Sequence, residues 1–433
     1  MSVTTDAGMN LRTAAFPGTT PRLITGSGRE DYDAYVAGGG YAPISDAEAL
    51  LTLVSDAGLR GRGGAAFPLA QKIRTVKTGP AVPVLLANGE EGEPASVKDR
   101  WLMRYRPHLV LDGVRLAAAM VGAEDVYIYV SDRASATSLR DALAQLPETT
   151  DVIGRACVHE VDSTYVAGEE TAAVRSINGG PALPQDKPPR PFQSGVHDRP
   201  TLVSNVETLA NLPYVQQHGA AEYRTVGTED SAGTFLMTLT GTANNGLYEV
   251  PFGTTLAEVL RWLGDETAVT GALVGGYFAG VLSARVLDIP LDYAELRAAG
   301  SGLGCGAMAV IDSAVCPVAV SADVLAYFDR ENAGQCGSCF NGTAAMAAAM
   351  AALCDGRADD RDVERLRAWS VGLRGRGACG TLDGAANVAA GVLREYPELV
   401  TDHLNGLCGA CAQGRTPNTR PYAAIGEDRR SFA

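Results

Sequence analysis

The chain has 433 residues, of which 46% are hydrophobic and 20% charged, a composition typical of globular proteins rather than of disordered, fibrous or membrane-spanning ones. Its length suggests about two to four domains. Fifty acidic residues against 36 basic ones give a formal charge of -14, so the chain lacks the positive field that attracts a phosphate backbone. Nucleic-acid binding is therefore not expected.

The sequence also predicts the cellular compartment of the protein. The longest uncharged apolar stretch, Gly342 to Cys354, is shorter than the roughly 18 to 20 residues that a bilayer-crossing helix requires. The N-terminus has neither a basic start nor an apolar core and does not resemble an export signal. We therefore expect a cytoplasmic, reducing location with no direct membrane insertion. The nine cysteines, most of them between Cys316 and Cys411, suit a metal or cluster site better than a disulfide framework.

Changes in sequence texture divide the chain into four parts. Residues 1–43 are rich in Gly, Thr, Pro and Ser and are expected to form an N-terminal arm, with Ser45 as the first helix N-cap. Residues 44–230 alternate apolar runs with amphipathic helices, which predicts an α/β domain with a largely parallel sheet. Residues 231–315 are predicted to form a small α+β module, and residues 316–433 a helical bundle.

The elements follow from periodicity and turn residues. In chain order we expect a helix over 46–57, a strand over 82–87, a helix over 98–121, a strand over 125–130, a helix over 134–146, a proline-rich loop over 181–200, strands over 234–240 and 246–250, a helix over 255–263 and a strand over 272–275.

A glycine-rich turn follows the first predicted helix, with four glycines in the seven positions 58–64. Backbone amides in such a turn can approach a phosphate closely, because no Cβ blocks the ligand. Gly61-x-Gly63-x-x-Ala66 matches a dinucleotide-binding pattern, but the turn follows a helix and not the strand that this pattern requires. The turn is therefore either a tight connection between helices or, given nearby Arg60, Arg62 and Lys72, an anion-binding loop.

Two acidic clusters are further candidates for a site. Asn88-Gly89-Glu90-Glu91-Gly92-Glu93 lies at the carboxyl end of a predicted strand, where open α/β sheets bind ligands, and Tyr165 to Glu170 is similar. A charge run is usually a solvated loop, yet two glycine-flanked Glu pairs favour contacts with ribose hydroxyls and a redox ring. No other feature supports a glycosidase-type carboxylate pair.

Together these motifs resemble one family. Gly-Leu-Arg-Gly-Arg-Gly-Gly-Ala-x-Phe-Pro, Asn-x-x-Glu-x-Glu-Pro with Lys98-Asp99-Arg100, Tyr-x-x-Gly-Glu-Glu-Thr-Ala and Val203-x-Asn205-Val-Glu-Thr-Leu occur in the order found in the NADH- and FMN-binding flavoprotein subunit of respiratory complex I. Diaphorase subunits of NAD-linked hydrogenases and formate dehydrogenases are similar. The resemblance covers about residues 45 to 400. It implies an α/β FMN-binding domain, a small β-grasp module and a helical [4Fe-4S] domain.

The resemblance also implies a set of cofactor-binding residues. These are Gly61, Arg62, Gly63, Gly64, Phe67, Lys72, Asn88, Glu90, Glu91, Glu93, Tyr165, Gly168, Glu169, Glu170, Val203 and Asn205. Glu93 and Glu170 match carboxylates that contact the nicotinamide nucleotide. The implied chemistry is hydride transfer between cofactors, in which the protein supplies geometry and electrostatics and no catalytic acid or base.

The chain departs from the family at the cluster motif. The family has Ser-Cys-Gly-x-Cys-x-x-Cys and a fourth cysteine some forty residues on, whereas here Ala333 replaces the first cysteine and leaves Cys336, Cys339 and Cys379. Three thiolates remain where four are standard, so the cluster is absent, has three irons or recruits a substitute ligand. Cys408-x-x-Cys411 is a further pair with metal-ligand spacing.

A second departure concerns the nucleotide. Two aromatic positions that sandwich adenine in the family are Thr75 and Arg190 here, and the Asn before Val is Ser204. Lost stacking costs about 0.5 to 1.5 kcal/mol for each ring. Arg190, with Lys187 in the same loop, could instead meet a 2′-phosphate and favour NADPH over NADH.

The sequence therefore predicts an FMN-dependent NAD(P)H dehydrogenase subunit that passes electrons to an iron-sulfur acceptor. A thioredoxin-like [2Fe-2S] partner or a ferredoxin is expected from the resemblance. Two alternatives remain: a degenerate relative that serves as a structural or adapter subunit, and a ligand-binding module acting through the β-grasp segment Gly275-Gly276-Tyr277-Phe278. The acceptor, the choice between NADH and NADPH, the oligomeric state and the pathway are not determined by the sequence.

Overall fold

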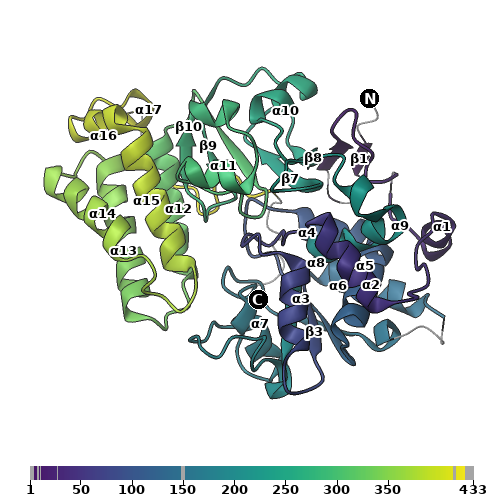
Figure 1. Cartoon of the computed structure of the whole chain (residues 1–433). Helices are drawn as coiled ribbons and strands as arrows, with labels where there is room; N and C mark the ends of the chain where they lie inside the picture. Colours follow the sequence, from purple (N-terminus) through teal and green to yellow (C-terminus); the bar gives the residue numbers. More distant parts are fainter. Residues whose placement is uncertain are drawn as a thin grey trace.

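A computed structural model describes residues 4–6, 9, 11–26, 28–147, 152–412 and 416–424. Two β-sheets and a domain of helices make up the molecule, and Figure 1 shows the helical domain at the left, the second sheet in the upper part and the first sheet at the lower right. Their hydrophobic cores are separate clusters of buried side chains.

The first sheet is parallel throughout and has the order β5-β4-β3-β6. Its strands are β3 (Val84–Asn88), β4 (Asp125–Val130), β5 (Cys157–Glu160) and β6 (Thr201–Asn205). The chain proceeds from β3 to β4 and β5 on one side and then returns to β6 on the other. The strand order thus reverses between β3 and β6, the position at which α/β sheets bind ligands beyond the carboxyl ends of their strands.

Helices pack around this sheet because both its faces are apolar. Residues 84–87 of β3 are fully buried, and α5 is buried along nearly its whole length. The elements are α2 (Ala47–Ala57), α3 (Leu69–Lys77), α4 (Lys98–Tyr105), α5 (Pro107–Val121), α6 (Arg133–Ala144), η1 (Val152–Arg155), α7 (Glu170–Ile177), η2 (Val196–Asp198), α8 (Val206–Ala210) and α9 (Leu212–Tyr223).

The second sheet has seven strands, mixes parallel and antiparallel pairs, and has the order β1-β2-β8-β7-β11-β9-β10. Its strands are β1 (Thr4–Asp6), β2 (Leu11–Ala15), β7 (Thr234–Thr240), β8 (Gly246–Pro251), β9 (Val269–Val274), β10 (Val281–Ser283) and β11 (Met308–Asp312). The helices α10 (Leu256–Leu263), η3 (Ala284–Asp288) and α11 (Tyr293–Ala298) belong to this part of the chain.

The N-terminal segment differs from the expected arm. Within 1–43, β1 and β2 join the second sheet, β2 pairs in parallel with β8, and α1 (Tyr32–Ala37) follows. The buried carboxylate of Glu249 accepts the backbone N–H groups of Arg22, Leu23 and Ile24. Because that anchor lies more than 200 residues later in the chain, local sequence patterns could not indicate it. Residues 1–3, 7–8, 10 and 27 of this segment lie outside the described part.

The third part contains α12 (Pro317–Glu331), α13 (Gly337–Cys354), α14 (Asp360–Gly372), α15 (Thr381–Glu395), α16 (Pro397–Leu404) and α17 (Gly409–Ala412). Among the described residues one helix, α13, is long and apolar enough to cross a membrane, and 44% of that stretch is buried inside the molecule. It packs against α12, α14 and α15, so it is a core helix of this domain.

Most predicted elements occur within a few residues of their expected ends. The strands over 125–130 and 234–240 match β4 and β7, and the glycine-rich turn lies between α2 and α3. Two details were wrong. Asp46, not Ser45, caps α2 by accepting the N–H groups of Glu48 and Ala49. The helix over 98–121 is broken into α4 and α5 at Arg106, because Pro107 cannot donate a helical hydrogen bond.

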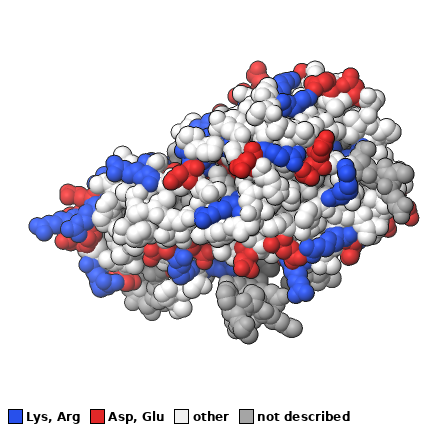
Figure 2. All heavy atoms as spheres, turned by 90° about the horizontal axis from the view of Figure 1, so that it is seen from below, with Lys and Arg blue, Asp and Glu red and all other residues white. Residues whose placement is uncertain are grey.

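Figure 2 shows one face of the molecule with basic and acidic side chains interspersed. No broad basic area is seen among the described residues on that face.

Candidate functional site

The glycine-rich loop, residues 60–68, lies beside the carboxyl ends of β3 and β6. Its base is closed by a hydrogen bond from Gly61 N–H to the Phe67 carbonyl, 2.9 Å, and its tip is exposed. The Arg62 N–H donates to the Thr208 hydroxyl on α8, 2.8 Å. A Cβ on Gly63 would lie 3.2 Å from Cβ of Asn205, at the end of β6. The loop therefore approaches β6 more closely than a larger residue would easily permit.

The Arg62 side chain points away from the loop tip. It is 2% exposed, lies over the Phe252 ring at 4.4 Å and donates to the Tyr223 hydroxyl and the Thr234 carbonyl. Its Nε lies 4.0 Å from a carboxylate oxygen of Glu207. The Arg62 side chain thus joins the first domain to the second sheet, and only its backbone belongs to the candidate site.

A buried charged network, Lys98, Asp99, Asn205 and Glu207, fixes the ends of β6 and α4. The Lys98 ammonium lies 2.7 Å from Asp99 and 2.9 Å from Glu207, and Asn205 donates to Asp99 at 2.8 Å. Burial alone would lower the pKa of Lys98, but Asp99 and Glu207 outweigh it and raise that pKa. The other Glu207 oxygen accepts Leu236 N–H from the second sheet, 2.9 Å.

The two acidic segments meet at one point. Asn88 donates from Nδ2 to the Gly168 carbonyl, 2.8 Å, and a Cβ on Gly168 would lie 2.5 Å from Oε2 of Glu90. A Cβ on Gly92 would lie 2.7 to 3.0 Å from backbone atoms of Thr164 and Tyr165. The structure therefore brings 88–93 and 164–170 into contact, and the close backbone approach at position 92 requires glycine there.

Glu90, Glu91 and Glu93 have different surroundings. Glu90 accepts from the Ser131 hydroxyl at 3.2 Å, but its buried Oε2 has no hydrogen-bond partner among the described residues. Burial raises the pKa of Glu90 to about 8, so its carboxyl is mostly protonated at neutral pH. Glu91 accepts the N–H groups of Asp99 and Arg100 at the start of α4, so its carboxylate has a structural role.

Glu93 faces the second sheet. Its carboxyl accepts Ala95 N–H, 3.2 Å, and a Cβ on Gly276 would lie 2.3 Å from the Glu93 carboxyl carbon. Burial raises the pKa of Glu93 to about 8 as well. Glycine at 276 thus lets the loop after β9 approach this carboxyl.

Glycine loops of the second sheet complete the surroundings, and the sequence interpretation did not assign them to the site. A Cβ on Gly64 would lie 3.9 Å from the carbonyl carbon of Gly304, and a Cβ on Gly304 would lie 2.6 Å from the Gly275 carbonyl oxygen. The repeated glycines at 275–276 and 302–306 were the available signal. The sequence interpretation placed Gly275 and Gly276 only in an alternative ligand-binding module, because these loops lie more than 200 residues from the turn that they face.

Tyr165 connects the site with the helical domain. Its ring packs edge-on against Phe328 and Tyr327 of α12, with centroids 5.2 and 5.8 Å apart. Burial raises the pKa of the Tyr165 hydroxyl far above its usual value, with additional contributions from nearby Glu93 and Cys379. Tyr165 therefore belongs to an aromatic cluster shared with α12 and lies near both Glu93 and Cys379.

The segment 169–190 carries an ion-pair cluster. Glu169 caps α7 and pairs with Lys187, whereas Glu170 lies 3.6 Å from both Lys187 and Arg190. Lys72 of α3 faces this cluster: burial lowers the pKa of Lys72, and nearby Glu170 opposes the shift. Lys187 and Arg190 of the proline-rich loop thus already have carboxylate partners.

Phe67 and Val203, the two remaining residues predicted from the sequence, contribute less directly to the candidate site. Phe67 is 45% exposed at the base of the glycine-rich loop. Val203 is 4% exposed and packs in a small cluster with Leu86, Tyr129 and Val174. Val203 therefore supports the sheet beneath the site.

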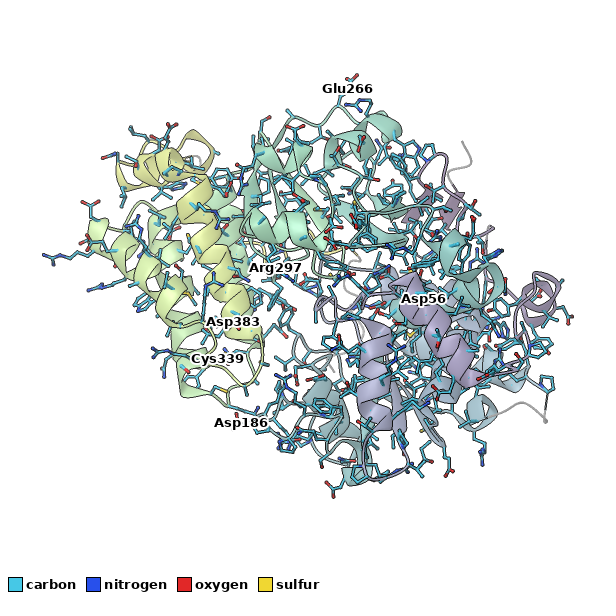
Figure 3. The ribbon with its side chains drawn as sticks, viewed as in Figure 1. Asp56, Asp186, Glu266, Arg297, Cys339 and Asp383 are labelled. Carbon is cyan, nitrogen blue, oxygen red and sulfur yellow. The ribbon has the colours of Figure 1, made fainter. Side chains whose placement is uncertain are left out.

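The three cysteines of the expected cluster motif lie near one another. The Cys336 sulfur accepts a hydrogen bond from the N–H of Ala378, the residue before Cys379, at 3.4 Å. Burial, with smaller contributions from the nearby Cys379 and Cys336 thiols, raises the pKa of Cys339 to about 12. Figure 3 shows Cys339 and Asp383 in the helical domain, with Asp186 in the loop of the first domain. Gln335 joins these regions by donating to the Pro184 carbonyl, 2.8 Å. Ala333 contributes no ligand atom.

The residues present fit a flavin phosphate better than they fit a four-thiolate cluster. The loop tip offers backbone amides without Cβ atoms, α3 begins without a side-chain cap, and Lys72 lies on the same helix. Glu90 has an unused buried oxygen that can donate or accept according to its protonation. For iron-sulfur binding, the described residues supply three of the four thiolates of the motif.

Comparison with known proteins identifies two regions. Residues 54–214 match the Nuo51 FMN-binding domain, and residues 319–403 match the NADH-ubiquinone oxidoreductase-F iron-sulfur binding region. The first region contains the glycine-rich loop and both acidic segments. The second contains all three cysteines of the expected cluster motif.

Whole-chain relatives agree. The F 2 subunit of NADH-quinone oxidoreductase in Rhizobium meliloti is 32% identical over 397 residues, covering 86% of this chain and 93% of that protein. The corresponding F subunit of Aquifex aeolicus is 32% identical over 386 residues, covering 84% of this chain and 89% of that protein.

A solved structure shows the same fold. The air-oxidized NAD⁺-reducing [NiFe]-hydrogenase contains a chain that is 31% identical with a TM-score of 0.76, and the match covers 83% of this chain. The present chain spans 63% of the length of that hydrogenase chain. Because these sequence matches cover most of the chain and most of each relative, the chain belongs to the family of NADH-quinone oxidoreductase F subunits.

Proposed function

We propose that this chain is the NADH-oxidising flavoprotein subunit of an electron-transfer complex and that it delivers electrons to an iron-sulfur acceptor. One observation carries the proposal: three segments lie close together beyond the carboxyl ends of β3 and β6. The segments 88–93 and 164–170 are joined by the Asn88–Gly168 hydrogen bond, and the glycine-rich loop approaches Asn205 at Gly63. When bound there, FMN supplies the chemistry that accepts a hydride and releases electrons singly.

The protein's contribution is to hold the flavin and set its surroundings. The exposed amides at Gly63 and Gly64 and the start of α3 suit the phosphate, with Lys72 as a nearby cation. Glu90 supplies a carboxyl that is mostly protonated at neutral pH, which adds no negative charge beside an electron-rich ring. Asn205 is held by the buried network, so its position is fixed before any ligand binds.

The ion pairs favour NADH as the nucleotide. A 2′-phosphate on NADPH would need Arg190 or Lys187, but both lie 3.6 Å from Glu170, and Lys187 also pairs with Glu169. Binding the phosphate would have to break these pairs or tolerate the carboxylates beside it. We therefore propose Glu93 and Glu170 as contacts of the non-phosphorylated ribose and nicotinamide.

The electron exit is proposed to lie at Cys336, Cys339 and Cys379. Tyr165 contacts α12 on one side and the Glu93 region on the other, so the aromatic cluster lies between flavin and thiols. Three thiolates can hold a three-iron cluster, or a four-iron cluster whose fourth iron takes a non-protein ligand. For onward transfer we propose a [2Fe-2S] partner subunit or a ferredoxin as acceptor, as the family resemblance implies.

The domain assignment follows the same proposal. The FMN domain is assigned to residues 44–230, the β-grasp module to residues 231–315 together with β1 and β2, and the cluster domain to residues 316–433. The packing of α13 inside the bundle supports a peripheral position of the subunit in the complex.

Replacement of the first cluster cysteine by Ala333 favours one second candidate. A subunit that retains the flavin site but lacks the cluster would act as an adapter within the complex. The two functions differ in whether reduced flavin is reoxidised through iron.

The nucleotide preference is the first test. Anaerobic addition of NADH to the flavin-loaded protein should bleach the flavin absorbance, and NADPH should require at least about tenfold more for the same extent, a difference of about 1.4 kcal/mol. In the variant Arg190→Ala, the ratio of NADPH to NADH needed for equal bleaching should not rise, because Arg190 is already paired with Glu170 and is not expected to bind a 2′-phosphate. A better response of the unmodified protein to NADPH, or no bleaching by either nucleotide, would contradict the proposal.

Gly92→Ala tests the contact between the two acidic segments. The added Cβ would meet backbone atoms of Thr164 and Tyr165 and push the segments apart, so FMN affinity should fall by about tenfold or more. Fluorescence titration of the flavin-free protein with FMN measures the change. Gly372→Ala, at a position with no atom within 4 Å, is the matched control and should bind FMN normally.

The raised pKa of Glu90 predicts a pH-dependent stability. Because the folded protein retains this proton up to about pH 8 and the unfolded chain loses it near 4.5, stability should fall as pH rises through that window and level off above it. The slope from one group is at most about 1.4 kcal/mol per pH unit.

Urea unfolding of flavin-free protein across this pH range measures the effect. Glu90→Gln should flatten the slope, whereas Glu266→Gln, at an exposed surface position labelled in Figure 3, should leave it unchanged. An identical slope in the Glu90 variant would show that Glu90 does not carry the raised pKa.

Ala333→Cys tests the cluster assignment. The variant restores the four-thiolate motif, so it should bind four irons per chain and show the paramagnetic resonance of a reduced four-iron cluster. Asn341→Cys, which adds a thiol at an exposed position of α13, should leave the iron content of the original protein unchanged. Absence of iron from both the original protein and the Ala333 variant would favour the adapter function.

A further inference from the structure

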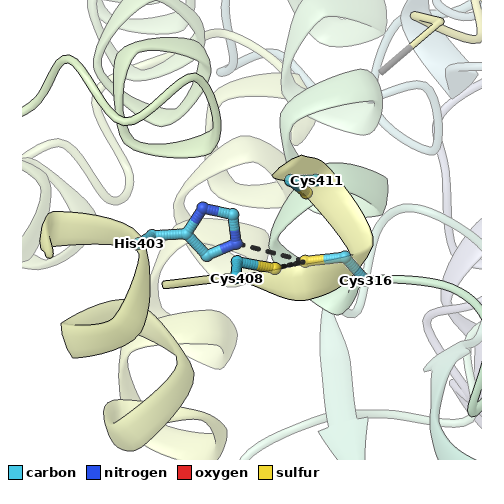
Figure 4. Close-up of side chains that lie close together, drawn as sticks. All are labelled: Cys316, His403, Cys408 and Cys411. Atoms are coloured by element: carbon cyan, nitrogen blue, oxygen red, sulfur yellow. Dashed lines mark hydrogen bonds between the residues drawn. The ribbon is translucent and has the colours of Figure 1, made fainter. Parts of the chain in front are cut away.

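A second group of metal-ligating side chains lies outside the expected iron-sulfur motif. The group consists of four residues from three places in the chain. Cys316 directly precedes α12, His403 lies near the end of α16, and Cys408 and Cys411 lie just before and within α17. Figure 4 shows the four side chains directed toward one another. Their ligand atoms all lie within 4.8 Å of one another, and no other metal-ligating group of this kind is found among the described residues.

The spacing fits one tetrahedral ion. With zinc–sulfur bonds of about 2.3 Å and zinc–nitrogen bonds of about 2.0 Å, ligand atoms lie about 3.5 to 3.8 Å apart. The Cys316 sulfur lies 3.9 Å from that of Cys408 and 3.2 Å from Nε2 of His403. A multi-iron cluster would have to place its own iron and sulfide atoms between these ligands, and the spacing leaves room for a single ion.

The surroundings also match a closed structural site. Cys316, His403 and Cys408 are at most 8% exposed, so a bound ion would be shielded from solvent. The backbone carbonyls of Leu353 and Cys354 face the imidazole of His403. Carbonyls in this position orient a metal-bound histidine by accepting from its other ring nitrogen.

We propose that Cys316, His403, Cys408 and Cys411 bind one structural Zn²⁺ ion. Three thiolates and one imidazole in tetrahedral spacing select zinc over harder cations, and four protein ligands leave no open position for catalysis. The ion would fasten the C-terminal segment to the junction between β11 and α12.

The fastening has a mechanical consequence for the candidate flavin site. Beyond Cys411 the chain returns to the acidic loop: Asn418 N–H donates to Asp323, the Pro421 carbonyl accepts from the Tyr277 hydroxyl, and Ala424 N–H donates to the Pro94 carbonyl at 2.9 Å. Pro94 directly follows Glu93. The zinc site therefore anchors one end of a segment whose other end packs beside the proposed nucleotide contact.

Metal analysis of the full-length purified protein tests the proposal. The original protein should contain about one zinc per chain. The Cys408→Ser variant should lose most or all of its zinc and keep its iron. The Cys379→Ser variant should lose iron and keep its zinc. Cys157→Ser, which removes an exposed thiol on β5, is the matched control and should keep both metals.

X-ray absorption at the zinc edge of the original protein gives an independent measurement that requires no variant. It should show about three sulfur neighbours near 2.3 Å and one nitrogen near 2.0 Å. Oxygen-rich coordination, zinc content unaffected by Cys408→Ser, iron in place of zinc, or a disulfide at Cys316 that persists in protein purified under reducing conditions would overturn the proposal. Flavin content is measured separately, so failure of the zinc site and failure of the flavin function remain distinguishable.

Discussion

The buried interaction of Lys98 with Asp99 and Glu207 determines how the parts of the candidate site are held. It joins the first turn of α4, the first turn of α8 directly after β6 and, through the second Glu207 oxygen, β7 of the other sheet. Arg62 adds the glycine-rich loop to the same charged network. Removing one member of a buried ion pair typically costs about 3 to 5 kcal/mol, because the remaining charge stays in a poorly solvating interior. Such a network specifies one arrangement of several segments and tolerates little displacement.

The sequence predicted the elements and the order of motifs well. The apolar runs of β4 and β7 and the glycine-rich turn between α2 and α3 carry strong local signals, and the structure confirms them. The break at Pro107 was missed because the hydrophobic periodicity continues across it. The anchoring of residues 22–24 on Glu249 could not be predicted, since it depends on a partner in another sheet.

The site was predictable only in part for the same reason. Gly63, Asn88 and Gly168 were named from motifs, and the structure brings their loops together, although their contacts with cofactors remain predictions. The motifs did not indicate that the Arg62 side chain turns inward or that Glu91 caps α4. His403 was not recognised as a companion of Cys316 and Cys408, because a single histidine on an amphipathic helix has no distinctive spacing.

The pairing of β2 with β8 has a consequence for the order in which the chain folds. A strand made within the first fifteen residues must wait until residues 246–251 have been synthesised before its hydrogen-bonding partner exists. Contacts between such distant segments form slowly, since the entropy of closing a long loop must be overcome first. During translation β2 therefore lacks its β8 partner while the parallel sheet assembles. Binding of β2 by a chaperone at that stage would prevent it from pairing with neighbouring chains.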